Sequence, residues 1–376
     1  MTIRPRLPLA FESGDSPGWI FRVFLLAALL LAVPLAAIAG QTADANPTHP
    51  VAAITNQTTA TAPLNDAATV ILVAGVEGEA EYQVLFRQWA AHWSNACQQA
   101  GVRCLAIGLT HHPNPTDKAL FQNLLQSQSH TNPAPLWIVL IGHGTFDDRE
   151  AKFNLRGPDL TATELAAWLK PFQRPLIIIN TASASGPFLP ALSAPGRVVI
   201  TATRSGHEQS FARFGGYLAT ALVNPVADLD KDGQTSLLEA FLMASRATGE
   251  FYKVEGRLAS EHPLLDDNGD RLGTPADWFR GIRPVQQPEQ KGTLDGLRAH
   301  QVHLLPNPAE RQWSQRKLAR RDALEQTIAA LREQKKQLGE SEYYARLEPI
   351  LMELATLYET PETPDSAGPS TKPGSE

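Results

Sequence analysis

Hydrophobic runs and amphipathic stretches alternate along residues 67–225, and each change of pattern predicts a new element. Short apolar runs such as TVILVAG and PLIIIN are typical of strands buried on both faces. Stretches with apolar residues three and four positions apart predict helices. The predicted strands cover residues 69–75, 102–108, 135–144, 175–180 and 197–203, and the predicted helices cover residues 81–97, 117–126, 161–169 and 210–223. This alternation predicts an α/β fold with a mostly parallel sheet flanked by helices on both faces.

Two local patterns add detail to this fold. The predicted helix at residues 81–97 has an apolar stripe, which we expect in the core and not in a ligand-stacking platform: Tyr82, Leu85, Phe86, Trp89, Trp93 and Cys97. Thr161 and Glu164 have the spacing of a capping box, in which each residue satisfies a main-chain N–H of the other. The box predicts where the helix at residues 161–169 begins.

The N-terminal residues 1–40 have the pattern of an export signal. Three arginines precede the 17-residue apolar run VFLLAALLLAVPLAAIA, which ends in the small-x-small pattern that signal peptidases cut. A cleaved signal peptide is therefore predicted. An uncleaved membrane anchor is the alternative, since the run is at the short limit for crossing a bilayer. Either way, we expect the protein to be exported, as a periplasmic or extracellular protein or one anchored to the membrane and facing outward.

The remaining composition divides the chain further. Residues 41–66 are predicted to be a flexible linker, residues 67–294 the α/β domain and residues 361–376 a disordered tail. Residues 295–360 predict an α-helical hairpin, broken at Gly339 between two heptad-like stripes: Leu324, Ile328, Leu331 and Leu338, then Tyr343, Leu347, Leu351, Leu354 and Tyr358. This hairpin is either an arm for docking or homo-oligomerisation or a helix pair packed on its own domain.

Charge and cysteine content narrow the possible partners. The formal net charge of −6 gives the chain no overall basic field, so we do not expect nucleic acid as a partner. Cys97 and Cys104 are the only cysteines, and they flank the predicted change from a helix to a strand. They are either a local disulfide, which an oxidising compartment would permit, or two small buried side chains.

Candidate catalytic residues lie at the ends of two of the predicted strands. His143 and Gly144 end the strand at residues 135–144, and Ser183 follows the strand at residues 175–180. Because the carboxyl ends of parallel strands lie at one edge of a sheet, we expect these residues to converge there. The imidazole is suited to act as a general base, and the Gly144 N–H to stabilise an oxyanion.

The order of motifs over residues 67–225 resembles the legumain-type peptidases and, more distantly, the caspases. VAGVEG resembles the end of the first legumain strand, with Glu77 at the position of an Asn, and His143-Gly144 matches the catalytic His-Gly. Ala182-Ser183-Ala184-Ser185-Gly186 aligns with the nucleophile motif, with Ser183 in place of Cys. TATRSGHEQSF resembles the substrate-pocket segment, with Glu208 and Ser210 in step after one inserted residue. The resemblance implies a caspase-like fold, catalytic roles for His143 and Ser183, and a substrate pocket lined by Thr181, Glu208 and Ser210.

The departures from the motif leave three functions open. A serine hydroxyl needs a base to remove its proton, whereas a thiol ionises near neutral pH, so replacing Cys by Ser favours a degenerate peptidase that binds peptide or protein partners. The alternative is an active serine hydrolase, because a Glu77 carboxylate that oriented His143 would complete a Ser183-His143-Glu77 triad. The third function is a calcium-stiffened scaffold in the cell envelope. Thr181 replaces the acidic residue of the legumain pocket, so we do not carry over asparagine specificity.

A calcium-binding loop is predicted independently of the resemblance. DLDKDGQTSLLE, at residues 228–239, has the EF-hand pattern, with oxygen ligands at Asp228, Asp230, Asp232, Gln234, Ser236 and Glu239 and a turn at Gly233. A weaker second site is predicted from Asp266, Asn268 and Asp270, with a more distant Asp277. Arg271 stands there at the glycine position, so an acidic turn without an ion is the alternative.

Overall fold

The computed structural model describes residues 68–110, 114–286 and 294–359 of the chain. The predicted signal or anchor, the linker and the C-terminal tail lie outside these residues. In the part that is described, no helix is both long and apolar enough to cross a membrane.

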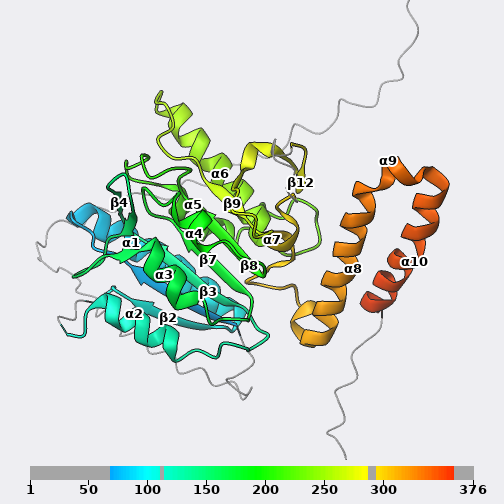
Figure 1. The fold of residues 1–376 in the computed structure, drawn as a ribbon, viewed down its shortest axis with the longest axis horizontal. Coiled ribbons are helices and arrows are strands. Elements are labelled where there is room, and N and C mark those ends of the chain that lie inside the picture. The colour runs from blue at the N-terminus through cyan, green and yellow to red at the C-terminus, as the bar shows by residue number, and fades with distance from the viewer. Residues whose placement is uncertain (1–67, 111–113, 287–293, 360–376) are drawn as a thin grey trace, which may run out of the picture. The chain divides into compact units, whose positions relative to one another are not determined.

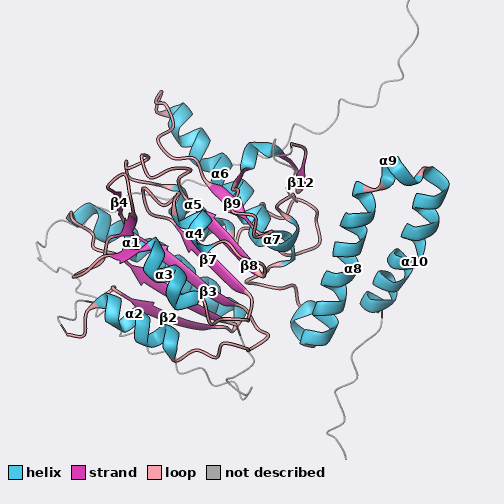
Figure 2. Cartoon of the chain, viewed as in Figure 1, coloured by secondary structure: helices cyan, strands magenta, loops and turns pink. Residues whose placement is uncertain are grey.

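A seven-stranded sheet, in the order β10-β9-β8-β7-β3-β1-β2, forms the centre of the domain. Its five parallel strands are β1 (Thr69–Ala74), β2 (Arg103–Ile107), β3 (Leu136–Ile141), β7 (Leu176–Asn180) and β8 (Arg197–Thr201). Two short antiparallel strands, β9 (Leu264–Asp266) and β10 (Thr274–Pro275), extend the edge beside β8. In Figure 2 the strands β3, β7 and β8 lie side by side.

Helices cover both faces of the sheet, as the sequence predicts. One face packs on α1 (Ala80–Ala100), α5 (Phe214–Ala221) and α6 (Leu237–Val254). The other packs on α2 (Asp117–Gln126), α3 (Ala162–Leu169) and α4 (Phe188–Leu192) (Figure 1). Alternate residues of each strand point to opposite faces, so Val70 and Leu72 belong to the first cluster and Ile71 and Val73 to the second. The prediction of a mostly parallel α/β fold is confirmed.

Smaller elements surround the sheet. A three-stranded sheet consists of β4 (Gly144–Phe146), β5 (Ala151–Phe153) and β6 (Leu160–Thr161). A second, two-stranded sheet consists of β11 (Phe279–Arg280) and β12 (Arg283–Pro284). The remaining elements are the 3₁₀ turns η1 (Ala276–Trp278) and η2 (Glu310–Gln312) and the helix α7 (Leu297–Gln301).

Local chemistry explains where several elements begin. Thr161 and Glu164 form both hydrogen bonds of the predicted capping box at the start of α3. The helix predicted at residues 210–223 is shorter, because it begins at Phe214. There the Glu261 carboxylate accepts hydrogen bonds from the N–H groups of Arg213 and Phe214. These N–H groups at the N-terminus of α5 have no partner within the helix.

The helical hairpin consists of α8 (Gln315–Glu333), α9 (Lys335–Leu338) and α10 (Glu340–Glu359). Gly339 separates α9 from α10 and has φ +74°, a conformation that glycine adopts without strain. The preceding segment is part of the α/β domain, because Ala299 and Leu304 lie in the core cluster beside α6. Within the hairpin, α10 buries little of its surface apart from Tyr343.

The aromatic stripe of α1 lies in the core, with Phe86, Trp89 and Trp93 buried. Cys97 and Cys104 are both free thiols. Cys97 is fully buried, and the Cys104 sulfur lies 3.9 Å from the Ser94 hydroxyl. Of the two alternatives for the cysteines, the structure has the reduced pair.

Candidate functional site

The loops after β3 and β7 meet at the carboxyl edge of the sheet, where the sequence places them. The Gly144 N–H donates to the Ser183 hydroxyl across 3.2 Å, and this hydroxyl donates to the Gly144 carbonyl across 3.1 Å. A Cβ at position 144 would lie 2.2 Å from the Ser183 carbonyl oxygen. The two loops therefore approach so closely that only glycine fits at position 144.

Ser183 is buried, with 3% of its surface exposed, and its hydroxyl both donates to Gly144 and accepts from it. Its proton is directed at a main-chain carbonyl, and among the described residues no hydrogen bond joins it to His143. The next residue, Ala184, has φ +51°, and its N–H donates to the Glu208 carbonyl. The N–H groups of Gly144 and Ala184 are thus both occupied within the protein, including the predicted oxyanion donor.

His143 lies in an aromatic enclosure formed by Tyr82, Phe86 and Phe211, whose ring centres are 4.7, 5.2 and 5.8 Å from the imidazole centre. Its Nε2 lies 3.2 Å from the main-chain carbonyl oxygen of Glu77. A carbonyl only accepts, so we assign the proton to Nε2, which leaves Nδ1 as the basic nitrogen. Burial lowers the pKa of His143, partly offset by the Glu77 carbonyl and the charge of Glu79. Burial therefore favours the neutral form of the ring.

The Glu77 carboxylate is directed away from His143. It pairs with the Arg156 guanidinium and accepts a hydrogen bond from Gln83 at 3.3 Å. Arg156 also donates to the Gly108 carbonyl and lies 3.5 Å from the Asp117 carboxylate. Burial acts to raise the pKa of Glu77, but its hydrogen bonds and the charge of Arg156 outweigh this and lower it. The structure brings Glu77 to His143 through its main chain, and the carboxylate arm of the predicted triad is not formed.

The three residues expected in a substrate pocket have different environments. Thr181 is buried, donates to the Leu140 carbonyl and packs beneath Gly215. Glu208 joins two segments, since its carboxylate lies 2.5 Å from the His262 ring and 3.1 Å from the Arg204 guanidinium. Ser210 alone is exposed at a cavity.

Two cavities flank this part of the domain. The first, which we call the Tyr82 pocket, has a volume of about 310 Å³ and is lined by Glu81, Tyr82, Leu85, Ser210, Phe211, Arg213, Tyr252, Arg257 and Ser260. It shares Tyr82 and Phe211 with the enclosure of His143. The second, the α4 groove, has a volume of about 640 Å³ and runs from Gly186 past α4 to the turn between β9 and β10.

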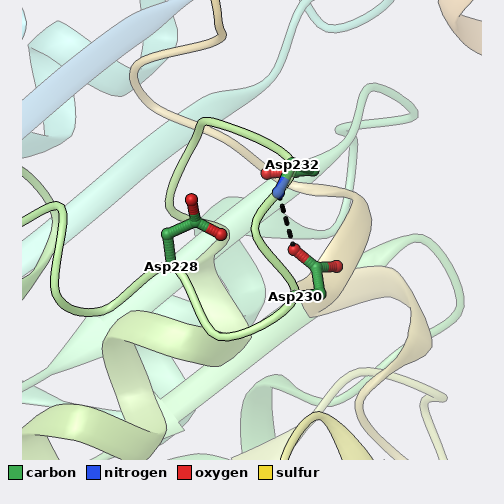
Figure 3. Close-up of side chains that lie close together, drawn as sticks. All are labelled: Asp228, Asp230 and Asp232. Carbon is green, nitrogen blue, oxygen red and sulfur yellow. Dashed lines mark hydrogen bonds between the residues drawn. The ribbon is translucent and has the colours of Figure 1, made fainter. Parts of the chain in front are cut away.

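The predicted calcium loop gathers three carboxylates before α6. One oxygen each from Asp228, Asp230 and Asp232 lies within 4.8 Å of the others (Figure 3). Glu239 is used differently, because one carboxylate oxygen caps Ser236 and the other accepts from the Leu229 N–H at 2.7 Å. The Gln234 side chain bridges Asp232 and the Asn307 N–H. Burial raises the pKa of Asp230, and the neighbouring Asp232 and Glu239 raise it further. Within the described part of the chain, these three aspartates are placed to hold a cation.

The second predicted loop, which begins at Asp266, has the same pattern of hydrogen bonds to its main chain as the first, which begins at Asp228. Asp228 accepts from the N–H groups of Lys231 and Gly233, and Asp266 accepts from those of Gly269 and Arg271, at the same spacings. The residues at the fourth and sixth positions have positive φ in both loops: Lys231 at +64°, Gly233 at +86°, Gly269 at +82° and Arg271 at +72°. Asp277 lies on η1, outside this turn.

Sequence reasoning missed two features of the site. Arg156, which binds the Glu77 carboxylate, lies in the connection between β5 and β6, where no periodicity or motif marks it. The enclosure of His143 was hidden for another reason. Tyr82 and Phe86 have core spacing on α1, and that spacing does not tell which turn of the helix borders a loop.

Comparisons with known proteins give only distant similarity. No protein-family model matches the chain, and no characterised protein matches it in sequence. Among solved structures it is similar to the Drosophila initiator caspase Dronc, with 14% identity and a TM-score of 0.38, over 55% of this chain and 82% of the caspase. It is also similar to Caspase-1 from Spodoptera frugiperda, with 9% identity and a TM-score of 0.36, over 54% of this chain and 87% of that caspase. A third similar structure is Raptor from Chaetomium thermophilum, with 11% identity and a TM-score of 0.29, over 43% of this chain and 17% of Raptor. At these scores the similarity to caspases is distant and assigns no activity.

Proposed function

We propose that this chain is an exported peptide- or protein-binding protein on a caspase- and legumain-like fold, whose peptidase site is degenerate. The observation that carries the proposal is the Ser183 hydroxyl, which is buried and hydrogen-bonded on both sides to the Gly144 main chain. A serine nucleophile needs its proton on a nearby base. Here the Ser183 hydroxyl donates its hydrogen bond to the Gly144 carbonyl, and the His143 Nε2 is directed at the Glu77 carbonyl.

The electrostatics of the neighbouring loops support the same function. In a working triad the carboxylate stabilises the imidazolium that forms when the base takes a proton. The Glu77 carboxylate instead neutralises Arg156, so a protonated His143 would have a carbonyl dipole, aromatic rings and the charge of Glu79 around it, and no carboxylate hydrogen-bonded to the ring. Such a site retains cavities for binding a chain segment but lacks the charge arrangement for hydrolysing it.

A fluorophosphonate, which captures activated serines, tests this proposal. The full-length protein is incubated with the probe and its intact mass measured, with Ser183→Ala as the matched variant and a known serine hydrolase as the reagent control. We expect no adduct on either protein while the reagent control is labelled. A stoichiometric adduct that disappears in Ser183→Ala would establish the active hydrolase and overturn the proposal.

We propose in addition that the Asp228–Asp232 loop binds one calcium ion, because three carboxylates converge where the EF-hand pattern places ligands. Mutual repulsion of these carboxylates is relieved when a cation binds, so binding stabilises the folded state. Saturating calcium should therefore raise the melting temperature, and Asp230→Asn should abolish most of this rise. Glu250→Gln, at an exposed carboxylate on α6 outside both acidic loops, is the matched control. A melting temperature that does not change when calcium is added, or a rise that Asp230→Asn does not reduce, would contradict the assignment.

A further inference from the structure

The α4 groove lies beside the loop that follows β7 and has apolar walls. It begins at Gly186, three residues beyond Ser183, and its walls include Phe146, Leu189, Leu264, Leu272 and Trp278. It shares none of the residues that line the Tyr82 pocket. The α4 groove is therefore a second surface on which a ligand could bind, separate from the Tyr82 pocket.

The charges of the groove are of one sign. Its lining includes Arg204, His207 and Arg271 and contains no aspartate or glutamate, although the whole chain has a net charge of −6. Arg204 pairs with Glu208, and His207 lies 3.7 Å from Asp148. Among the described residues, none accepts a hydrogen bond from the Arg271 guanidinium, which leaves that cation available to a ligand.

The main chain at Arg271 is held in a conformation that favours glycine. Its φ of +72° corresponds to the +86° of Gly233 at the same position of the first loop, where the chain does use glycine. A side chain in the left-handed region is strained, and such strain is concentrated at functional sites. The N–H of Arg271 still makes the hydrogen bond of the loop to Asp266, so the loop design itself does not require an arginine. What arginine adds over glycine is a guanidinium in the α4 groove.

We propose that the α4 groove binds a peptide segment in which an acidic side chain lies beside large apolar ones, with Arg271 as the residue that selects the acid. The inference rests on the proposed function, because it names the class of peptide that the degenerate site would hold. A guanidinium binds a carboxylate through paired charged hydrogen bonds, and the apolar walls bury the neighbouring side chains. The groove thus distinguishes acidic-apolar from basic or purely polar peptides.

Fluorescence anisotropy on the full chain tests the groove. The probe is a fluorescein-labelled, C-terminally amidated decapeptide in which glutamate alternates with leucine, and the same peptide with glutamine in place of glutamate is its neutral partner. We expect the acidic peptide to bind roughly tenfold more tightly than the neutral one, with the difference reduced at high salt. Equal affinity for the two peptides would overturn the proposal.

Two variants separate binding from folding. Arg271→Gly removes the guanidinium and the backbone strain together, so it should lower the affinity for the acidic peptide to that of the neutral one and raise the melting temperature. Arg271→Gln keeps the strain and should lose the same affinity, whereas Arg246→Gln, at an exposed arginine on α6, should leave binding unchanged. Undiminished binding by a folded Arg271→Gly protein would contradict the assignment.

The outcome is independent of the fluorophosphonate experiment. If Ser183 is labelled but Arg271 still selects the acidic peptide, the degenerate site is wrong and the groove stands. If Ser183 is not labelled and Arg271→Gly binds like the unmodified chain, the groove is wrong and the degenerate site stands.

Discussion

At the scale of single residues, the site is controlled by close main-chain approach more than by side-chain chemistry. Gly144 and Ser183 exchange two hydrogen bonds because no Cβ at position 144 keeps the two loops apart. This packing holds the serine hydroxyl in place and also occupies it. The absence of a Cβ at Gly144 lets the two loops converge, and the hydrogen bonds that then form direct the Ser183 hydroxyl at Gly144 instead of His143.

We predict that Gly144→Ala destabilises the fold, because its Cβ would lie 2.2 Å from the main-chain oxygen of Ser183 and the two loops would have to move apart. The expected loss in free energy of unfolding is about 2–3 kcal/mol, measured by urea denaturation. Gly249→Ala is the matched control, since that helical glycine on α6 has no atom within 4 Å of the added Cβ. It should gain about 0.5–1 kcal/mol. Equal effects of the two substitutions would refute the close approach.

His143 gives a prediction about pH. Burial lowers its pKa in the folded protein below the unfolded value of about 6.5. Below that value the unfolded state binds more protons, so the contribution of His143 to stability is complete above pH 6.5 and is lost as the pH falls toward the folded pKa. An NMR titration of the imidazole should give a midpoint below 6.5. His143→Phe should reduce the slope of unfolding free energy against pH in this range, and a midpoint above 6.5 would contradict the enclosure.

The sequence predicted which residues converge but not how their side chains are directed. His143, Gly144 and Ser183 could be placed at one edge because parallel strands share a carboxyl end. The direction of the Glu77 carboxylate could not, since it depends on Arg156, which arrives from a connection of irregular backbone 79 residues later. Long-range ion pairs leave no local periodicity to detect.

At the scale of elements, regular segments were predictable and short ones were not. The five parallel strands were located from continuous apolar runs, and α3 from its capping box. The strands β9 and β10 have three and two residues and no alternation, so they look like loop in the sequence. They are strands because β8 presents an unpaired edge whose main-chain groups need partners.

A buried cation joins α8 to η2 and to α7, where the Arg321 guanidinium donates to the Gln301 carbonyl. Arg321 pairs with Glu310 and Asp322, and the Tyr358 hydroxyl donates to Glu310 at 2.9 Å. Burial alone would lower the pKa of Arg321, but the two carboxylates raise it, so the guanidinium stays charged. Removing it would leave Glu310, which is 3% exposed, without its counter-ion.

We therefore predict that Arg321→Gln lowers the free energy of unfolding by about 3–5 kcal/mol, or separates the melting of the hairpin from that of the domain. Hydrogen exchange should show the loss of protection first in α8. Arg346→Gln, whose exposed partner Glu342 lies four residues away, is the control and should change stability by less than about 0.5 kcal/mol. A small effect at both positions would show that the buried pair does not anchor α8.

At the scale of the whole molecule, α10 exposes a row of large apolar side chains. Tyr344, Leu351 and Tyr358 recur every seven residues and are 48%, 45% and 48% exposed, and the adjacent Met352 is 63% exposed. Basic residues predominate on α8 and α9 and acidic residues on α10, as in the cross-pair of Arg320 with Glu353. A second copy of the hairpin, placed antiparallel, would set the acidic helix of one chain beside the basic helices of the other.

This pattern predicts self-association through the hairpin. Leu351→Glu places a charge in the centre of the seven-residue repeat, so it should shift the protein toward monomer in sedimentation velocity while leaving its melting temperature nearly unchanged. Leu258→Glu is the matched control, because Leu258 is 94% exposed and lies outside the hairpin, after α6. Because the interface is apolar at its centre and charged at its flanks, added salt should weaken it only in part. A monomer before any substitution would leave the hairpin as an arm for a different protein, and equal effects of the two leucine variants would assign the association to general surface hydrophobicity.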